Sequence, residues 1–102
     1  LKTNSMVLDF TFMPNNLPGV RTVKFQYLGT AAAEGWPAIF CACENCKRAR
    51  KLGWRNIRTR SQAIIDDKLL IDFPPDTYMH VLQYGLDLSK IESCLITHNH
   101  ED

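Results

Sequence analysis

No run in the sequence approaches the roughly 18 consecutive apolar residues that a membrane-spanning helix needs, and charge of neither sign dominates. The 102 residues are 45% hydrophobic and 23% charged, with a formal net charge of +1 at pH 7. The first twenty residues also lack the basic start and unbroken apolar block of a signal peptide. Near-neutral charge argues against a strongly basic nucleic-acid module and against an acidic tail. The sequence therefore predicts a single globular domain that does not enter a membrane, and we expect it in the cytoplasm.

Cysteine is scarce, and four residues are too few for a disulfide scaffold in a chain of this length. Cys41, Cys43 and Cys46 fall within six residues, whereas Cys94 stands alone in an apolar stretch. Disulfides between residues this close are strained, so the cluster indicates thiolates that bind a metal. Cys94 is expected in the core, because free cysteine is among the most buried residue types.

Four stretches have the composition of β-strands. Alternation of apolar and polar residues predicts strands at 7–12 and 23–28. Residues 61–65 and 68–73 are rich in aliphatic side chains, and Asp66-Asp67 between them has the length of a tight hairpin turn. We therefore expect an antiparallel hairpin beside the strand at 23–28.

Two helices are expected as well. The basic residues 47–52 favour a short helix that ends at a glycine. Asp76 can act as the N-cap of a second helix, in which apolar residues recur at helical spacing, namely Tyr78, Val81, Leu82 and Leu86. A short apolar strand at 93–97 follows. Because strands and helices alternate along the chain, the predicted fold class is α/β.

The sequence ends in a histidine-rich motif, His98-Asn99-His100-Glu101-Asp102. In an extended segment residues i and i+2 project to one side, so His98 and His100 can offer imidazole nitrogens to one ion, with Asp102 within reach. Imidazole and carboxylate ligands suit zinc, manganese or iron. The motif predicts a catalytic metal site with His98, His100 and Asp102 as ligands. The alternative is a solvated segment without a metal.

The cysteine cluster has the spacing of a structural zinc site. The two residues between Cys43 and Cys46 let both thiolates contact one tetrahedral ion, and Cys41 adds a third thiolate. One coordination position then remains for another ligand. The alternative interpretation, three small buried hydrophobes, fits poorly with the polar residues Glu44 and Asn45 between the cysteines.

Basic residues are concentrated between positions 41 and 60, and Glu44 is the only acidic residue in this stretch. They are Lys47, Arg48, Arg50, Lys51, Arg55, Arg58 and Arg60. Such a patch can attract phosphate-bearing ligands or nucleic acid. However, Trp54 is the only aromatic residue among them, whereas single-strand binders use several. A solvated basic helix is an equally good interpretation, and nucleic acid is not favoured as a partner.

The segment at 96–102, Ile-Thr-His-Asn-His-Glu-Asp, resembles the metal-binding signature of the metallo-β-lactamase fold superfamily, which in that family continues with one more histidine. That family also places an aspartate at a strand end, and Asp72 after Leu69-Leu70-Ile71 matches this position, although Phe73-Pro74-Pro75 departs from the usual small-residue turn. The resemblance implies that Asp72 does not bind the metal itself but orients a histidine that does. A helix-proximal cap in the Pro-Pro turn is the alternative role.

A second set of motifs resembles one particular branch of this superfamily. Gly29-Thr30, the Gly-Trp-Pro loop at 35–37 and the Cys-x-Cys-x-x-Cys cluster are similar to the branch that contains the cyclic phosphodiesterase of bacterial phosphonate degradation. In that branch a like cluster holds a structural zinc together with a distant histidine. The similarity implies zinc at Cys41, Cys43 and Cys46, and zinc or manganese at the histidine motif.

The resemblance covers residues 23–102 and implies the N-terminal part of a metallo-β-lactamase-type αββα sandwich, truncated after its first metal-ligand motif. Residues 1–22 would be an N-terminal extension or linker. The implied function is that of a fragment of a metal-dependent hydrolase, a phosphodiesterase that uses metal-bound hydroxide on a small phosphodiester. Asp102 is the candidate catalytic residue. Further ligands of the family are missing, so the isolated chain is expected to be inactive.

A second hypothesis comes from a different class of protein, a small zinc-binding structural or interaction module. Its three cysteines would take a histidine as the fourth ligand, with His80, His98 and His100 as the candidates. Otherwise His80 is expected to be solvated, because it lies at a polar position of its helix.

Overall fold

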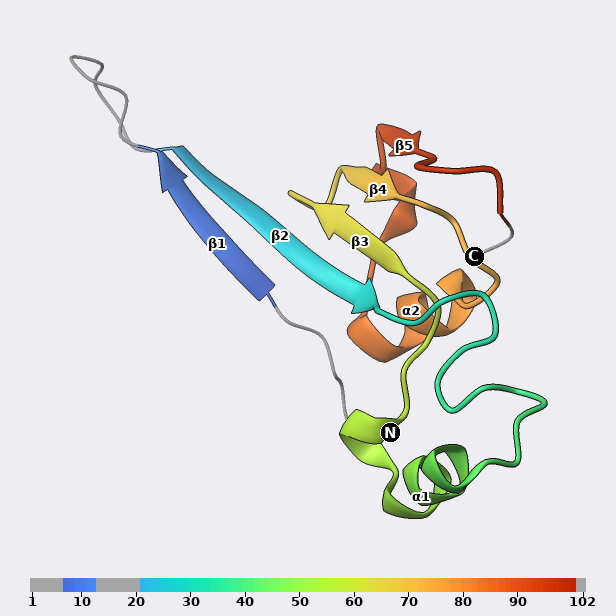
Figure 1. The fold of residues 1–102 in the computed structure, drawn as a ribbon. Coiled ribbons are helices and arrows are strands. Elements are labelled where there is room, and N and C mark those ends of the chain that lie inside the picture. The colour runs from blue at the N-terminus through green and yellow to red at the C-terminus, as the bar shows by residue number, and fades with distance from the viewer. Residues whose placement is uncertain (1–6, 13–20, 101–102) are drawn as a thin grey trace.

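A computed structural model describes residues 7–12 and 21–100 (Figure 1). Within these residues five strands form one mixed sheet in the order β1-β2-β3-β4-β5. The strands are β1 Val7–Phe12, β2 Arg21–Gly29, β3 Gln62–Ile65, β4 Leu69–Ile71 and β5 Ser93–Leu95. The helices are α1 Glu44–Leu52 and α2 Thr77–Tyr84, with 3₁₀ turns at Trp54–Asn56 and Leu88–Lys90. The mixed α/β class predicted from the sequence is confirmed.

β3 and β4 form the antiparallel hairpin that the sequence predicts, with Ile65 opposite Leu69. Asp66 and Asp67 both have positive φ, 52° and 57°, which gives the turn the backbone twist that two-residue hairpins prefer. The Asp66 carboxylate also accepts a hydrogen bond of 2.7 Å from the backbone N–H of Lys24. The turn is thereby attached to β2, which pairs antiparallel with β3 as expected.

β1 pairs antiparallel with β2 along its whole length, from Val7 opposite Gln26 to Phe12 opposite Arg21. In Figure 1 the two strands form a long ribbon that extends away from the other elements. Residues 7–12 therefore belong to the same sheet as the hairpin.

β5 lies at the other edge of the sheet and pairs parallel with β4, with Cys94 opposite Leu70. Among the described residues no strand pairs with its outer side, and all three of its residues are exposed. The prediction that Cys94 is a core residue is therefore wrong. An apolar strand composition does not distinguish a covered strand from an exposed edge strand.

The core consists of Leu28, Ile64 and Leu70, against which Tyr84, Leu86, Leu88 and Ile91 pack. α2 turns Thr77 and His80 inward, whereas Tyr78 and Leu82 are 70% and 59% exposed. The prediction that His80 is solvated is wrong, since its exposed fraction is 0%. Thr77, His80 and Tyr84 satisfy helical periodicity as well as the apolar residues do. On this face Thr77 and His80 are hydrogen-bonded, and Tyr84 packs against the core.

Asp76 precedes α2 but does not cap it with its side chain. Its carboxylate instead accepts from the backbone N–H of Arg60 at 2.8 Å and from Arg60 Nη1 at 2.9 Å. Asp76 therefore occupies the N-cap position that the sequence predicts, but its carboxylate serves Arg60 and not the helix N-terminus. The ion pair connects the start of α2 to the segment that returns from α1.

Residues 30–60 leave the end of β2 as an arm that carries α1 and then return to β3 (Figure 1). The backbone N–H groups of Thr30 and Ala31 donate to the Thr59 carbonyl at 3.0 and 2.7 Å, which closes the base of the arm. α1 begins at Glu44, earlier than the predicted Lys47, and ends at Gly53 as predicted. No helix in the described ranges is long and apolar enough to span a membrane.

Candidate metal centres

The three clustered cysteines converge at the start of α1. The sulfur atoms of Cys41, Cys43 and Cys46 all lie within 4.8 Å of one another. Cys46 is buried, Cys41 is half-buried and Cys43 is exposed. Thiolates about 2.3 Å from one tetrahedral zinc lie roughly 3.5 to 4 Å apart, so this cluster could hold a metal with little movement.

Local hydrogen bonds hold the cluster in place. Cys43 is the N-cap of α1, and its sulfur accepts from the backbone N–H of Cys46 at 3.4 Å. Arg50 in the last turn of α1 reaches back, and its Nη2 donates to the carbonyls of Ala38 and Cys41 at 2.9 and 2.7 Å. The loop that delivers Cys41 is thereby fastened to the helix that delivers Cys46.

The electrostatics of the cluster favour a thiolate at Cys43. The backbone N–H of Cys46, followed by the side chains of Cys41 and Cys46, lowers the pKa of the Cys43 thiol to about 7. For Cys46 a backbone hydrogen bond at Ala38 acts to lower the pKa, but burial and the two neighbouring cysteines raise it. A metal bound here would displace the protons that remain on the thiols.

Three of the seven basic residues in this region are used inside the fold. Arg50 fastens the cysteine loop, Arg60 pairs with Asp76 and donates from Nε to the Ala33 carbonyl at 2.8 Å, and Arg58 Nη1 donates to Thr30 Oγ1 at 3.1 Å. Arg55 lies over the ring of Trp54 at 4.8 Å. Much of the apparent basic patch therefore builds the arm.

The second candidate centre follows β5. Asp72, directly after β4, accepts from the backbone N–H of Thr97 at 2.8 Å and from its hydroxyl at 2.9 and 2.7 Å. Thr97 Oγ1 lies 2.9 Å from His98 Nδ1. The rings of His98 and His100 are 4.7 Å apart and nearly perpendicular, at 77°. Both histidines are exposed, and Asp102, the third predicted ligand, lies outside the described residues.

The hydrogen-bond chain assigns the tautomer of His98. The single hydroxyl proton of Thr97 points to the Asp72 carboxylate, which can only accept. Thr97 Oγ1 therefore accepts from Nδ1–H of His98, and Nε2 carries the lone pair that metal ligation requires. Asp72 thus acts on His98 through Thr97, a residue whose role the sequence did not reveal.

Asp72 is only 6% exposed. Burial acts to raise its pKa, but the N–H and O–H of Thr97 and the nearby His98 hold that pKa below the ordinary value of 3.8. Its backbone has φ 66°, a left-handed conformation that aspartate and asparagine tolerate better than most residues. The carboxylate is therefore charged and fixed at the edge of the second centre.

Asp72→Asn is expected to lower the free energy of unfolding by about 1 to 2 kcal/mol, because it replaces the charge-assisted hydrogen bonds from the N–H and hydroxyl of Thr97 by weaker neutral ones. Denaturant unfolding measures the loss. Asp67→Asn is the matched control, since Asp67 also has positive φ, 57°, but its side chain is 59% exposed. Equal losses in the two variants would contradict the role assigned to Asp72.

A buried chain of polar side chains lies behind this centre. His80 Nδ1 lies 2.6 Å from Gln62 Oε1, and His80 Nε2 lies 2.6 Å from Thr59 Oγ1. Gln62 Nε2 donates to the Asp72 carbonyl at 3.1 Å and to Thr77 Oγ1 at 3.0 Å. Both ring nitrogens of His80 are thus engaged in hydrogen bonds, which removes it as a fourth ligand for the cysteines.

Acidification is expected to destabilise the protein through His80. Burial lowers its pKa below 6.5, with Asp76 partly opposing the shift. Below pH 6.5 the unfolded chain takes up a proton that the folded protein resists, so stability falls as pH decreases, by up to about 1.4 kcal/mol per unit. Unfolding in a chelator at pH 7 and pH 5.5 measures this slope. His80→Gln should flatten it, and an unchanged slope would contradict the assignment.

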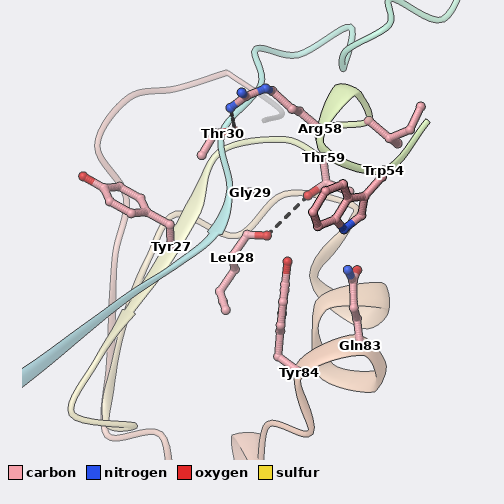
Figure 2. Close-up of a pocket in the computed structure, with 10 residues that line it drawn as sticks. Tyr27, Leu28, Gly29, Thr30, Trp54, Arg58, Thr59, Gln83 and Tyr84 are labelled. Atoms are coloured by element: carbon pink, nitrogen blue, oxygen red, sulfur yellow. Dashed lines mark hydrogen bonds between the residues drawn. The ribbon is translucent and has the colours of Figure 1, made fainter. Parts of the chain in front are cut away.

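A small cavity of about 50 Å³ lies where β2 ends against the arm and α2 (Figure 2). Tyr27, Trp54 and Tyr84 are among its walls, and the Thr59 hydroxyl lies 3.4 Å from the Leu28 carbonyl. Ligand sites usually enclose roughly 300 to 1,000 Å³. This cavity therefore marks the junction of the arm with the sheet and is too small for a substrate.

No protein-family model matches the chain, and none of the curated proteins matches it. Among solved structures the chain is similar to one described as a new diphosphatase from the PhnP family. The sequence identity is 30% and the TM-score is 0.65. The match covers 78% of this chain and 31% of that chain, so the protein spans about a third of the length of the diphosphatase. The similarity therefore concerns one part of that enzyme.

Proposed function

We propose that this chain is part of a metal-dependent hydrolase that acts on a small phosphoester. In this proposal residues 23–102 form the N-terminal portion of a metallo-β-lactamase-like domain. His98 and His100 contribute ligands for a catalytic zinc or manganese, with Asp102 as a third ligand and catalytic residue. Cys41, Cys43 and Cys46 hold a structural zinc.

The observation that carries the proposal is the Asp72–Thr97–His98 chain at the end of two parallel strands. Ligand histidines usually donate their second N–H to a fixed acceptor, which sets the ring and raises its basicity. Thr97, held by a buried carboxylate, is such an acceptor. His100 lies beside the oriented ring. The same carboxylate accepts from the Thr97 backbone N–H, so it also fixes the segment that carries both histidines.

The substrate class comes from the chemistry of the ligands and from the solved neighbour, a diphosphatase. Divalent ions bound by imidazole and carboxylate activate water and offset the charge of phosphoryl oxygens. The residues of this chain orient one ligand ring and place a second beside it. Catalytic zinc sites use at least three protein ligands, so we infer that the complete site includes groups beyond the described residues, and that the isolated chain is inactive. Four free cysteines also fit a reducing cytoplasm.

Hydrolysis of bis(p-nitrophenyl) phosphate and of a diphosphate ester tests the proposal, using both the 102-residue chain and the polypeptide encoded by the whole gene. We expect metal-dependent turnover from the latter alone, and a loss of about 100-fold or more in His98→Ala. Asp67→Asn, in the hairpin turn and outside both centres, is the control. Turnover that survives His98→Ala or a chelator would contradict the proposal. Zinc held by the cysteines without turnover by either polypeptide would favour the structural module instead.

A further inference from the structure

We propose that Gln62 is a positioning residue for the second metal centre: its side-chain amide fixes the backbone of Asp72, and Asp72 in turn orients His98 through Thr97. The inference rests on the proposed metal site at His98, but its structural part concerns Asp72 and Thr97 alone. It gives a role to a glutamine that lies in an otherwise aliphatic strand and is 1% exposed.

The orientation of the Gln62 amide follows from its partners. The Asp72 carbonyl, 3.1 Å away, can only accept, so the group that faces it is Nε2–H₂. Oε1 therefore faces His80, whose Nδ1 carries the proton. The Thr59 hydroxyl lies 2.6 Å from His80 Nε2 and 3.4 Å from the Leu28 carbonyl. The second amide hydrogen goes to Thr77 Oγ1, which itself donates to the Pro74 carbonyl at 2.7 Å. Only this orientation satisfies all partners.

Asp72 needs such a support because it stands where the chain leaves the sheet. Its N–H still donates to the Leu95 carbonyl at 2.8 Å, but its φ of 66° turns the next peptide away from the strand direction. A left-handed conformation is unfavourable for a residue other than glycine. Gln62 donates to the carbonyl of this residue. The Cys94 sulfur approaches the same oxygen only at 4.0 Å.

The consequence is a continuous path from the centre of the fold to the metal centre. His80 and Thr77 of α2 hold Gln62 of β3, Gln62 holds the Asp72 backbone, and the Asp72 carboxylate holds Thr97. Loss of the Gln62 amide should let Asp72 relax, after which Thr97 and the ring of His98 lose their fixed positions.

Gln62→Met, which keeps the length of the side chain and removes both hydrogen-bonding groups, tests the inference. Zinc at the His98 centre should bind about 10- to 100-fold more weakly, while zinc at the cysteines binds as before. In the metal-free protein the Thr97 amide should exchange its hydrogen at least about tenfold faster. Gln26→Met is the matched control, because Gln26 is also buried, 8% exposed, but lies on β2.

The two readouts separate this inference from the proposed function. A wild-type protein that binds no zinc at His98 contradicts the metal site, while the Thr97 exchange rate still decides the role of Gln62. Unchanged exchange and unchanged zinc affinity in folded Gln62→Met overturn the inference. If that variant does not fold, hydrogen exchange of the Gln62 side-chain amide in the wild-type protein tests the inference instead. We expect slow exchange, and rapid exchange would overturn the inference.

Discussion

Replacing Cys43 by serine is expected to lower the free energy of unfolding by about 4 kcal/mol in the presence of zinc, which corresponds to a thousand-fold loss of zinc affinity. In a chelator the same substitution should have almost no effect. The reason is that Cys43 caps α1 with its side chain, and serine is among the best N-cap residues. The substitution therefore removes a ligand and keeps the cap.

Parallel denaturant unfolding with zinc and with a chelator measures this difference. Cys94→Ser is the control, since Cys94 is exposed and lies outside the cluster. We expect this variant to keep nearly the wild-type free energy of unfolding both in zinc and in chelator. A structural zinc contributes directly to folding free energy, so equal stability of Cys43→Ser and the wild type in zinc would end the zinc assignment.

Gly29→Ala is expected to have the second largest effect and to lower the free energy of unfolding by about 3 kcal/mol. A Cβ built at Gly29 would lie 2.0 Å from the backbone oxygen of Arg60 and 2.7 Å from Thr59 Oγ1. Backbone atoms cannot rotate away as a side chain can, so β2 and the returning arm must separate. The separation would also stretch the bonds from Thr30 and Ala31 to the Thr59 carbonyl.

Gly85→Ala separates crowding from backbone strain. Gly85 has φ 63° and nothing within 4 Å of a built Cβ, so alanine there bears only the left-handed penalty of about 1 kcal/mol. Thermal or denaturant unfolding of both variants gives the comparison. If Gly29→Ala were no more destabilising than Gly85→Ala, the close approach of the arm to β2 would not be part of the folded state.

The parts of the fold that the sequence predicted well are those that local patterns determine. The Asp66-Asp67 turn, the flanking strands and the end of α1 at Gly53 depend on neighbouring residues. The predicted burial of His80 and of Cys94 was wrong, because burial depends on contacts between distant parts of the chain. Their burial depends on which face of α2 meets the sheet and on whether another strand covers β5, and neither is encoded within a few residues.

The residues of the two candidate metal centres also differ in how well the sequence predicts them. The cysteine cluster is contiguous in sequence, so its spacing was enough to predict that the three sulfurs meet. The support of His98 is assembled from β3, the end of β4 and α2. Thr97 and Asp72 are far apart in sequence, and Gln62 gave no signal other than a polar residue among aliphatic ones. Spacing rules cannot pair such residues, because the pairing is a property of the sheet.

The proposed function requires two separate metal centres in this chain, a strong one at the cysteines and a weaker one at the histidines. Titration of the metal-free protein with zinc against a chromophoric chelator tests it directly. We expect one tight equivalent that disappears in Cys43→Ser and persists in His98→Ala, and one weak equivalent with the reverse behaviour. A single equivalent abolished by both substitutions would contradict the claim, because it would show that the cysteines and His98 share one ion.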